Sequence, residues 1–391
     1  MNAQQTVIFD NPALFKMVGG VPLKPIIKWP GGKEKELPYI KRNAPDYFEN
    51  YYEPFVGGGS VFMSFDAKRM FINDKSPELI NLYKYIAVQD GEFYGWINGI
   101  TIAWSNTLAF VANNSHLCDF YKQFRNDKVD EKDVKLQLHH FVHSQLEELD
   151  SIIPHVFEWQ RCAFITEVEK SLVHKFKRMK KIECERTVMP ESDIYDNIET
   201  AFTGAMYTYL RALYNDNDLK SIKALSTALF VFLRNYAYSG MFRYNDKGDF
   251  NVPYGGISYN HKTMTSKMAY YRSATLLRHF SKTTIENLDF EDFFNRYQPT
   301  EQDFIFLDPP YDSEFSTYAQ NEFTKDDQKR LADYLCARCR AKWQLVIKYT
   351  PYIYSLYDRE GIVIKKFDKK YVVSFMNRND KDVEHLIITN Y

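Results

Sequence analysis

A short apolar run that ends in an acid and two prolines constrains this chain most. Residues 303–307 read Asp-Phe-Ile-Phe-Leu and predict a buried strand, and Asp308-Pro309-Pro310-Tyr311 follows directly. Proline lacks an N–H and fixes φ, so the two prolines can neither extend a sheet ladder nor continue as a helix. The chain must therefore leave the sheet in a stiff, extended turn.

This turn directs two acceptors, the Asp308 carboxylate and the Pro309 carbonyl, to the same side. An aromatic amine can donate one hydrogen to each of them while Tyr311 stacks on its ring. The same four residues are equally compatible with a strand-ending turn that a capping aspartate closes. The choice between the two depends on the rest of the sequence.

A glycine-rich loop follows a second predicted strand, Asn50–Glu53. It runs through Pro54-Phe55-Val56-Gly57-Gly58-Gly59, and a helix is expected at Ser60–Lys68, so a ligand can approach the backbone there. A further strand at 70–73 ends at Asp74, about 20 residues after Glu53, where nucleotide-binding folds place the acid that binds a ribose. The loop lacks the G-x-G-x-x-G pattern, and Gly31-Gly32-Lys33 does not match a phosphate loop and predicts a flexible turn.

Residues 92–280 change character, with long helical patterns and few strand signals. A turn at 245–248 predicts a hairpin at 241–252, which carries Arg243, Asn245, Lys247 and Asn251, with Tyr254 just beyond it. Such a ribbon fits the major groove, where arginine pairs with guanine and asparagine with adenine. A basic run at 170–181 is compatible with a solvated helix face or with a phosphate-contacting face. Late strands at 361–367, 371–376 and 385–389 have short connections, so part of the sheet should be antiparallel.

Composition narrows the class of protein. The net charge of −1 does not by itself indicate a nucleic-acid partner, and five scattered cysteines argue against a disulfide framework. No signal peptide or apolar run of membrane-spanning length is found, so a soluble, cytoplasmic protein is expected. Cys336-x-x-Cys339 has no second pair to complete a metal site, and no metal is expected.

Several blocks together resemble the Dam-like (D12 class) family of S-adenosylmethionine-dependent DNA adenine N6-methyltransferases. The blocks are Lys28-Trp29-Pro30-Gly31-Gly32-Lys33, Glu53-Pro54-Phe55-Val56-Gly57-Gly58-Gly59-Ser60, Asn73-Asp74, Phe242-Arg243-Tyr244-Asn245 through Phe250-Asn251-Val252-Pro253-Tyr254-Gly255, Asp308-Pro309-Pro310-Tyr311, and Arg378 to Tyr391. They occur in the family's order and span most of the chain. Tyr238-Ser239-Gly240 departs from the family's usual Phe-Asn-Gly, and the helical region is longer than in the smallest members. Both departures put the target sequence in doubt and leave the chemistry unaffected.

The resemblance implies an α/β fold, a Rossmann-like mixed sheet with an inserted, mainly helical DNA target-recognition domain. Residues 1–20 are expected to be a variable segment, 21–91 and 281–391 the catalytic domain, and 92–280 the recognition region. The implied cofactor is S-adenosylmethionine, and the implied catalytic turn is Asp308-Pro309-Pro310-Tyr311. The implied cofactor-binding residues are Trp29, Lys33, Glu53, Phe55, Gly57, Gly59, Asp74 and Asp308, with Asp74 on the ribose hydroxyls.

The expected reaction is methyl transfer to adenine N6 in double-stranded DNA after the base is flipped out. A bacterial or phage-encoded protein with no membrane partner is expected, and a restriction endonuclease acting on the same site is a candidate partner. Methylation of cytosine N4, methylation of adenine in RNA, and DNA binding without catalysis are the alternatives.

Overall fold

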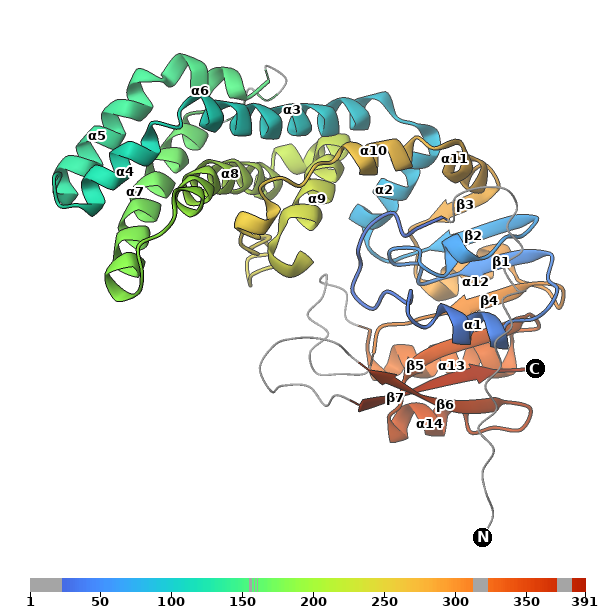
Figure 1. Cartoon of the computed structure of the whole chain (residues 1–391). Helices are drawn as coiled ribbons and strands as arrows, with labels where there is room; N and C mark the ends of the chain where they lie inside the picture. The colour runs from blue at the N-terminus through green and yellow to red at the C-terminus, as the bar shows by residue number, and fades with distance from the viewer. Residues whose placement is uncertain (1–22, 155–156, 158, 160, 312–322, 371–381) are drawn as a thin grey trace, which may run out of the picture.

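The computed structural model describes residues 23–154, 157, 159, 161–311, 323–370 and 382–391. In this part of the chain, a seven-stranded sheet has the strand order β3-β2-β1-β4-β5-β7-β6 (Figure 1). Strand β7 is antiparallel to its neighbours β5 and β6, and the other neighbours are parallel. The predicted mixed sheet is therefore confirmed. The strands are β1 (Asn50–Glu53), β2 (Arg69–Asn73), β3 (Thr283–Glu286), β4 (Phe304–Leu307), β5 (Lys342–Lys348), β6 (Val363–Lys370) and β7 (Asp382–Thr389).

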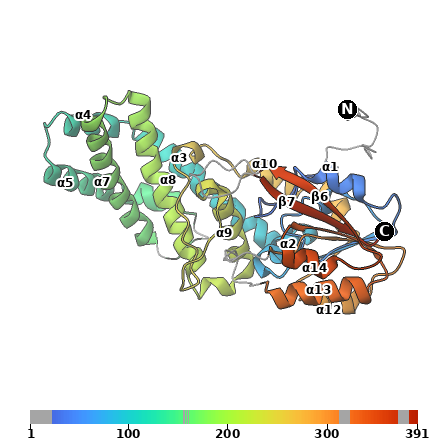
Figure 2. The same ribbon diagram turned by 90° about the horizontal axis from the view of Figure 1, so that it is seen from below.

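Both faces of the sheet are covered. Along β4, Phe304 and Phe306 belong to one hydrophobic core and Ile305 and Leu307 to another, and all four are fully buried. Alternate residues of a strand point to opposite faces, so this continuous apolar run marks a strand buried on both sides. Helices α12 (Phe290–Tyr297), α13 (Lys325–Ala337) and α14 (Pro351–Tyr357) pack on the Ile305 side (Figure 2). Helices α1 (Leu37–Asn43), α2 (Pro77–Val88) and α11 (Ala274–Phe280) contribute to the Phe304 side.

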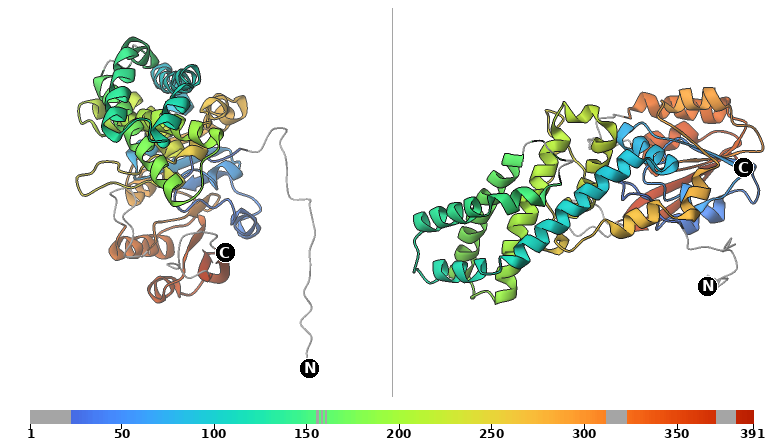
Figure 3. Two further views of the ribbon diagram at one scale, coloured as in Figure 1. Left: turned by 60° about the vertical axis from the view of Figure 1, so that its left-hand side comes forward. Right: turned by 90° about the horizontal axis from the view of Figure 1, so that it is seen from above.

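A long helical region separates β2 from β3 in the sequence. Its helices α3 to α9 extend away from the sheet to one side and make the molecule elongated, as Figures 1 and 3 show. Among the described residues, no helix is both long enough and apolar enough to cross a membrane. The helices of this region are α3 (Gly91–Asn113), α4 (Leu117–Arg125), α5 (Glu131–Ser144), α6 (Leu146–Ile152), α7 (Arg161–Glu185), α8 (Glu191–Asn215), α9 (Lys223–Tyr236) and α10 (Thr265–Tyr271).

The prediction of a helix at Ser60–Lys68 is wrong. Only a single 3-10 turn, Phe62–Ser64, follows the glycine loop, and Phe65 is extended (φ −107°, ψ 159°). Val61, Phe62 and Met63 are buried one after another, so the segment has no solvent-facing side of the kind that a surface helix needs. The variable segment 1–20, the strand expected at 371–376 and residues 312–322 lie outside the described residues.

Candidate active site

Three acidic residues lie at the carboxyl ends of adjacent parallel strands. Glu53 ends β1, Asp74 follows β2 and Asp308 follows β4. Strand β1 lies between β2 and β4, so the direction of strand order reverses at this point of the sheet. In open α/β sheets, ligands bind outside the carboxyl ends of the strands at such a switch point. The fold thus brings the expected catalytic turn and the expected cofactor-binding acids to one edge.

Lys33 contacts the expected catalytic turn. Its side chain is 1% exposed, and Nζ donates hydrogen bonds to an Asp308 carboxylate oxygen and to the Gly31 carbonyl (2.8 Å). The backbone N–H of Lys33 donates to Ser60 Oγ at 3.0 Å, so the residue after the glycine loop fixes the lysine. Burying either charge alone would be costly, and the pairing offsets part of that cost. The Gly31-Gly32-Lys33 segment, which its residue types alone predict to be a flexible turn, is therefore part of the site.

Two buried polar residues, His385 and Gln328, contact the proline turn from the protein interior. The Tyr311 hydroxyl lies 3.2 Å from His385 Nε2 on β7 and 3.4 Å from Lys33 Nζ. Gln328 on α13 donates from Nε2 to the Pro310 carbonyl at 2.8 Å. Both His385 and Gln328 are fully buried. A histidine directly before the apolar run Leu386-Ile387-Ile388 of β7 was a signal that could have identified His385, whereas Gln328 looks like any other polar residue of a helix.

Glu53 lies in an unusually dry environment for an acid. It is 2% exposed and accepts a hydrogen bond from the Tyr51 hydroxyl at 2.5 Å. Burial raises the pKa of Glu53 well above its usual range. The Tyr51 hydrogen bond and the Lys33 charge act in the opposite direction, and the Asp308 and Asp74 charges raise the pKa further. A cation bound beside Glu53 would favour the ionised carboxylate and oppose this rise of the pKa.

Asp74 joins the glycine loop to the start of α2. Its two carboxylate oxygens accept hydrogen bonds from the backbone N–H groups of Gly57 (3.0 Å) and Ser76 (2.9 Å). Burial raises the pKa of Asp74, and these hydrogen bonds oppose that rise. Gly59 has a φ of 84°, and a Cβ there would lie 2.4 Å from the Tyr83 hydroxyl. The close turn of this loop therefore requires glycine.

Trp29 connects the glycine loop with the helical region. A Cβ on Gly57 would lie 3.0 Å from Trp29 Cδ1, and the Trp29 ring contacts Phe242 with centroids 6.0 Å apart. Arg234, from the last turn of α9, lies over both rings and donates to the Lys28 carbonyl. Burial lowers the pKa of Arg234 to about 10. The base of the predicted hairpin and the predicted cofactor loop thus share one aromatic contact.

Phe55, the remaining expected cofactor contact, is half-buried at the tip of the same loop. Its ring contacts Phe290 (centroids 5.9 Å apart) and Phe323 (5.5 Å). All the residues expected around the cofactor therefore lie on the glycine loop, on the carboxyl ends of the strands or on the segment at 29–33 that packs against them.

The expected hairpin is present as a turn, held by single bridges and not by two regular strands. Tyr244 pairs with Phe250 in an antiparallel bridge, and the Asn251 N–H donates to the Arg243 carbonyl at 3.2 Å. Phe242 and Phe250 are buried, whereas Arg243 is exposed. The turn therefore has an apolar inner side and a polar outer side, although its ribbon is shorter than expected.

One side of α8 fixes the position of this hairpin. Tyr207 and Arg211 both donate to the Val252 carbonyl, at 2.9 and 3.1 Å. Asn215 makes two hydrogen bonds with the backbone of Phe250, one as donor (3.0 Å) and one as acceptor (2.9 Å). These helix residues are four apart and share one face. The hairpin is thus anchored by its backbone, which leaves its outer side chains available for another molecule.

The expected DNA-contacting residues differ in their surroundings. Arg243, Asn245 and Lys247 are exposed and Asn251 is half-buried. Arg243 Nε donates to Asn251 Oδ1 at 3.1 Å, and Asn245 Oδ1 accepts the backbone N–H groups that close the turn. Tyr254 is half-buried, with its hydroxyl donating to Asn260 at 2.8 Å and its ring against helix residues. These contacts of Tyr254 hold the hairpin against the helices.

The basic run 170–181 lies on α7, where several of its charges are already paired within the protein. Lys177 forms an ion pair with Glu131, and Lys180 pairs with Asp127 (2.5 Å) and donates to the Phe124 carbonyl (2.8 Å). These contacts favour the interpretation of the run as a solvated helix face.

Comparisons with known proteins agree with this geometry. The family model of D12 class N6 adenine-specific DNA methyltransferases matches residues 29–152 and 164–371. The type II methyltransferase M.CviBI of Paramecium bursaria Chlorella virus NC1A is 26% identical over 377 residues, which cover 94% of this chain and all of the relative. The type II methyltransferase M.MjaIII of Methanocaldococcus jannaschii is 26% identical over 94% of this chain and 99% of its own length. The DNA adenine methylase of Escherichia coli K12 is 22% identical over 78% of this chain and 73% of its own length.

Proposed function

The chain belongs to the D12 class of N6 adenine-specific DNA methyltransferases, and we propose that it uses S-adenosylmethionine to methylate an adenine flipped out of duplex DNA. The observation that carries the proposal is the position of Asp308. This carboxylate lies at the switch point of the sheet, is paired with buried Lys33 and is followed by the stiff Pro309-Pro310 turn. A rigid hydrogen-bond acceptor at this position can hold a substrate amino group in one orientation.

The chemistry of the residues present fits S-adenosylmethionine. The cofactor is cationic at its sulfonium and α-amino groups, and three carboxylates gather at this edge of the sheet. We assign Asp74 to the ribose hydroxyls and the loop of Glu53, Phe55, Gly57 and Gly59 to the methionine part, with Trp29 and Lys33 beside it. The bound cofactor would supply a methyl group already activated by the positive sulfur.

The catalytic turn positions the acceptor amine. The adenine N6 lone pair is delocalised into the ring, so the free amine is a weak nucleophile. Hydrogen bonds from N6 to Asp308 and to the Pro309 carbonyl favour a more electron-rich nitrogen and fix its direction. Lys33 keeps the Asp308 carboxylate in place, and a carboxylate has room for more than one donor. Tyr311 replaces the stacking that the flipped base loses.

The outer residues of the hairpin supply the sequence reading in this proposal. Arg243 and Asn245 are exposed on a turn whose backbone α8 fixes, and phosphate contacts would come from elsewhere in residues 92–280. The proposed place of action is the cytoplasm of a bacterial or phage-infected cell, where the DNA is. Two relatives are named type II methyltransferases, which supports a restriction endonuclease as a candidate partner.

Methyl transfer by purified protein tests the proposal. The wild-type chain should transfer labelled methyl groups from S-adenosylmethionine to duplex DNA, and digestion of the product should give N6-methyladenine. Asp308→Ala should abolish transfer and retain the wild-type circular dichroism spectrum, because Asp308 is the only carboxylate of the Asp308-Pro309-Pro310-Tyr311 turn. A product of N4-methylcytosine, or substantial activity of a folded Asp308→Ala protein, would overturn the assignment.

A further inference from the structure

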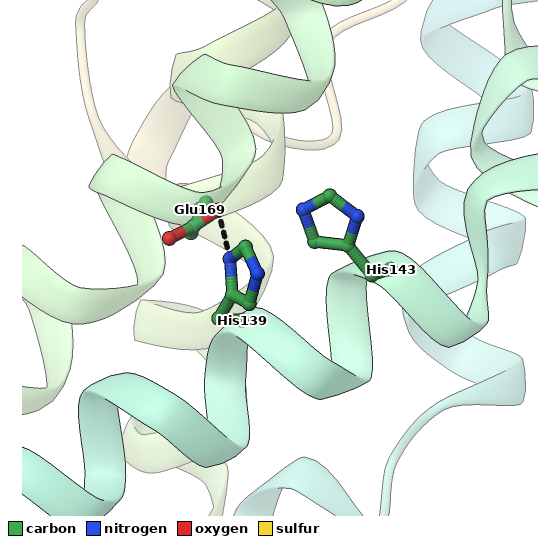
Figure 4. Close-up of side chains that lie close together, drawn as sticks. All are labelled: His139, His143 and Glu169. Atoms are coloured by element: carbon green, nitrogen blue, oxygen red, sulfur yellow. Dashed lines mark hydrogen bonds and ion pairs between the residues drawn. The ribbon is translucent and has the colours of Figure 1, made fainter.

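Two histidines and a glutamate meet in the helical region, outside the site described above. His139 and His143 are four residues apart on α5, so they lie on one face of that helix. Glu169 belongs to α7, which packs against α5. Figure 4 shows both rings on the side of α5 that faces Glu169. Helix α5, which carries both histidines, lies in the outer part of the helical region, away from the sheet (Figure 1).

The donor atoms of the three side chains are close together. One ligand atom from each residue lies within 4.8 Å of the others. His139 Nδ1 is 3.0 Å from Glu169 Oε2, and the two imidazole rings have centroids 4.0 Å apart. The His139 side chain is 45% exposed and that of Glu169 25% exposed, and His143 is exposed. These groups are accessible from solvent and can rotate without moving either helix.

Imidazole nitrogens with a carboxylate oxygen are a ligand set that suits zinc, copper or nickel. Metal–ligand bonds to such atoms are about 2.0–2.2 Å long, so the three donors need to close around an ion only by side-chain rotation. Three protein ligands leave one or more positions to water. An ion pair between His139 and Glu169 would explain one contact, but it does not require a second imidazole beside the first, one helical turn away.

We propose that His139, His143 and Glu169 bind one divalent transition-metal ion of the zinc type. The bound ion joins α5 to α7, two helices that are otherwise connected here by side-chain packing and surface charge pairs. Because the donors come from two helices, the ion binds the folded region and stabilises it. The site is structural and distant from the methyl-transfer residues, so it makes no contribution to the chemical step.

Metal titration of the full-length protein tests this inference. After treatment with chelator and its removal, calorimetry with Zn²⁺ should show one ion bound per chain, and Zn²⁺ should raise the melting temperature. Co²⁺ should give the visible absorption of a site with nitrogen and oxygen ligands. Mg²⁺ should not compete, because it prefers oxygen ligands and keeps its waters.

Single substitutions localise the site. His143→Ala and Glu169→Gln should each weaken Zn²⁺ binding by roughly 10–100-fold or more. Residues that merely hydrogen-bond to metal ligands already cost this much when they are mutated, and the loss of a ligand itself should cost at least as much. Both should also lose the Zn²⁺-dependent rise in melting temperature. His140→Ala on α5 and His174→Ala on α7 are matched controls and should bind as the wild type does. Equal Zn²⁺ affinity in the wild type and the His143→Ala variant, or loss of binding only in a control, would overturn the inference.

Discussion

Asp74 combines two roles at the level of the single residue. Its carboxylate holds the glycine loop through the Gly57 N–H and the start of α2 through the Ser76 N–H. In the proposed complex it also accepts hydrogen bonds from the ribose. A substitution can therefore weaken cofactor binding directly, or indirectly by loosening the loop, and a test has to separate these effects.

Asp74→Asn should weaken S-adenosylmethionine binding by roughly 1–3 kcal/mol, the loss expected when a charged acceptor is removed. Calorimetry measures this loss. Ser76→Ala is the matched control. It removes the side-chain cap of α2 but keeps the backbone N–H of residue 76, which donates a hydrogen bond to Asp74. If Ser76→Ala lowers the affinity as much as Asp74→Asn does, the ribose assignment fails and loop order explains the effect.

Glu53 should make the protein less stable as the pH rises. Burial raises its pKa in the folded state, so the folded protein holds this proton more tightly than the unfolded chain does. The contribution of Glu53 to stability therefore declines from about pH 4.3, the usual glutamate value, up to the raised pKa.

Glu53→Gln removes this titration and keeps an oxygen that can accept from Tyr51. The variant should be more stable than the wild type above pH 5, by about 0.5–2 kcal/mol, and should bind S-adenosylmethionine more weakly. Urea unfolding at several values between pH 5 and 8 measures the first effect. If the pH dependence of the unfolding free energy is unchanged in the variant, ionisation of buried Glu53 does not destabilise the folded protein.

The acids of the site were predictable and their partners were not. Asp74 and Asp308 end predicted strands, and strand ends of a parallel sheet meet at one edge, so sequence patterns suffice to bring them together. Lys33 lies 275 residues before Asp308 and pairs with it only because the fold places them side by side. His385 and Gln328 act on the turn from other strands and helices in the same way. Such contacts depend on tertiary packing, which local patterns do not contain.

At the scale of elements, continuous apolar runs and the lengths of the connections predicted the sheet. Strand β4 could be recognised because all its residues are apolar, and the mixed character of the sheet followed from the short late connections. The helix expected after the glycine loop fails because Val61, Phe62 and Met63 are all drawn into the core. The hairpin was recognised by its turn residues, but its anchoring by α8 could be seen only in the structure.

Arg243→Ala should relax base discrimination and not simply weaken DNA binding. Because α8 fixes the hairpin backbone, removal of this exposed side chain should leave the turn in place and cost about 1–3 kcal/mol on the proper site. Titrations on the proper duplex and on duplexes with single base changes measure the difference. Arg178→Ala on α7 is the control, since this exposed arginine of the basic run is expected to read no base, and its loss should affect all duplexes alike or none of them. If Arg243→Ala lowers the affinity for every duplex by the same factor, the hairpin contacts the DNA backbone and does not read the bases.

At the scale of the whole molecule, the sheet and the helical region share one continuous hydrophobic core, and a small aromatic cluster within it joins the glycine loop to the hairpin. The glycine loop approaches Trp29 at Gly57, and Trp29 contacts Phe230 and Phe242 from the helical side. Arg234 lies over the rings of Trp29 and Phe242 and is 4% exposed. A change of the loop on cofactor binding can therefore reach the base of the hairpin through packed side chains, and the reverse holds for DNA.

Trp29→Ala should uncouple cofactor binding from DNA binding. In the wild type, S-adenosylhomocysteine, which cannot donate a methyl group, should tighten binding of the proper duplex, and the duplex should tighten S-adenosylhomocysteine by the same factor. The variant opens space between the loop and the hairpin, so this factor should fall towards one even if each ligand still binds alone. Tyr47→Ala, which removes an aromatic side chain from a residue that is 72% exposed, should leave the factor unchanged. Measuring both affinities with and without the other ligand gives the factor twice, because coupling is reciprocal. A Trp29→Ala protein that keeps the full factor would show that the two parts communicate by another route, such as the Lys28 carbonyl that Arg234 binds.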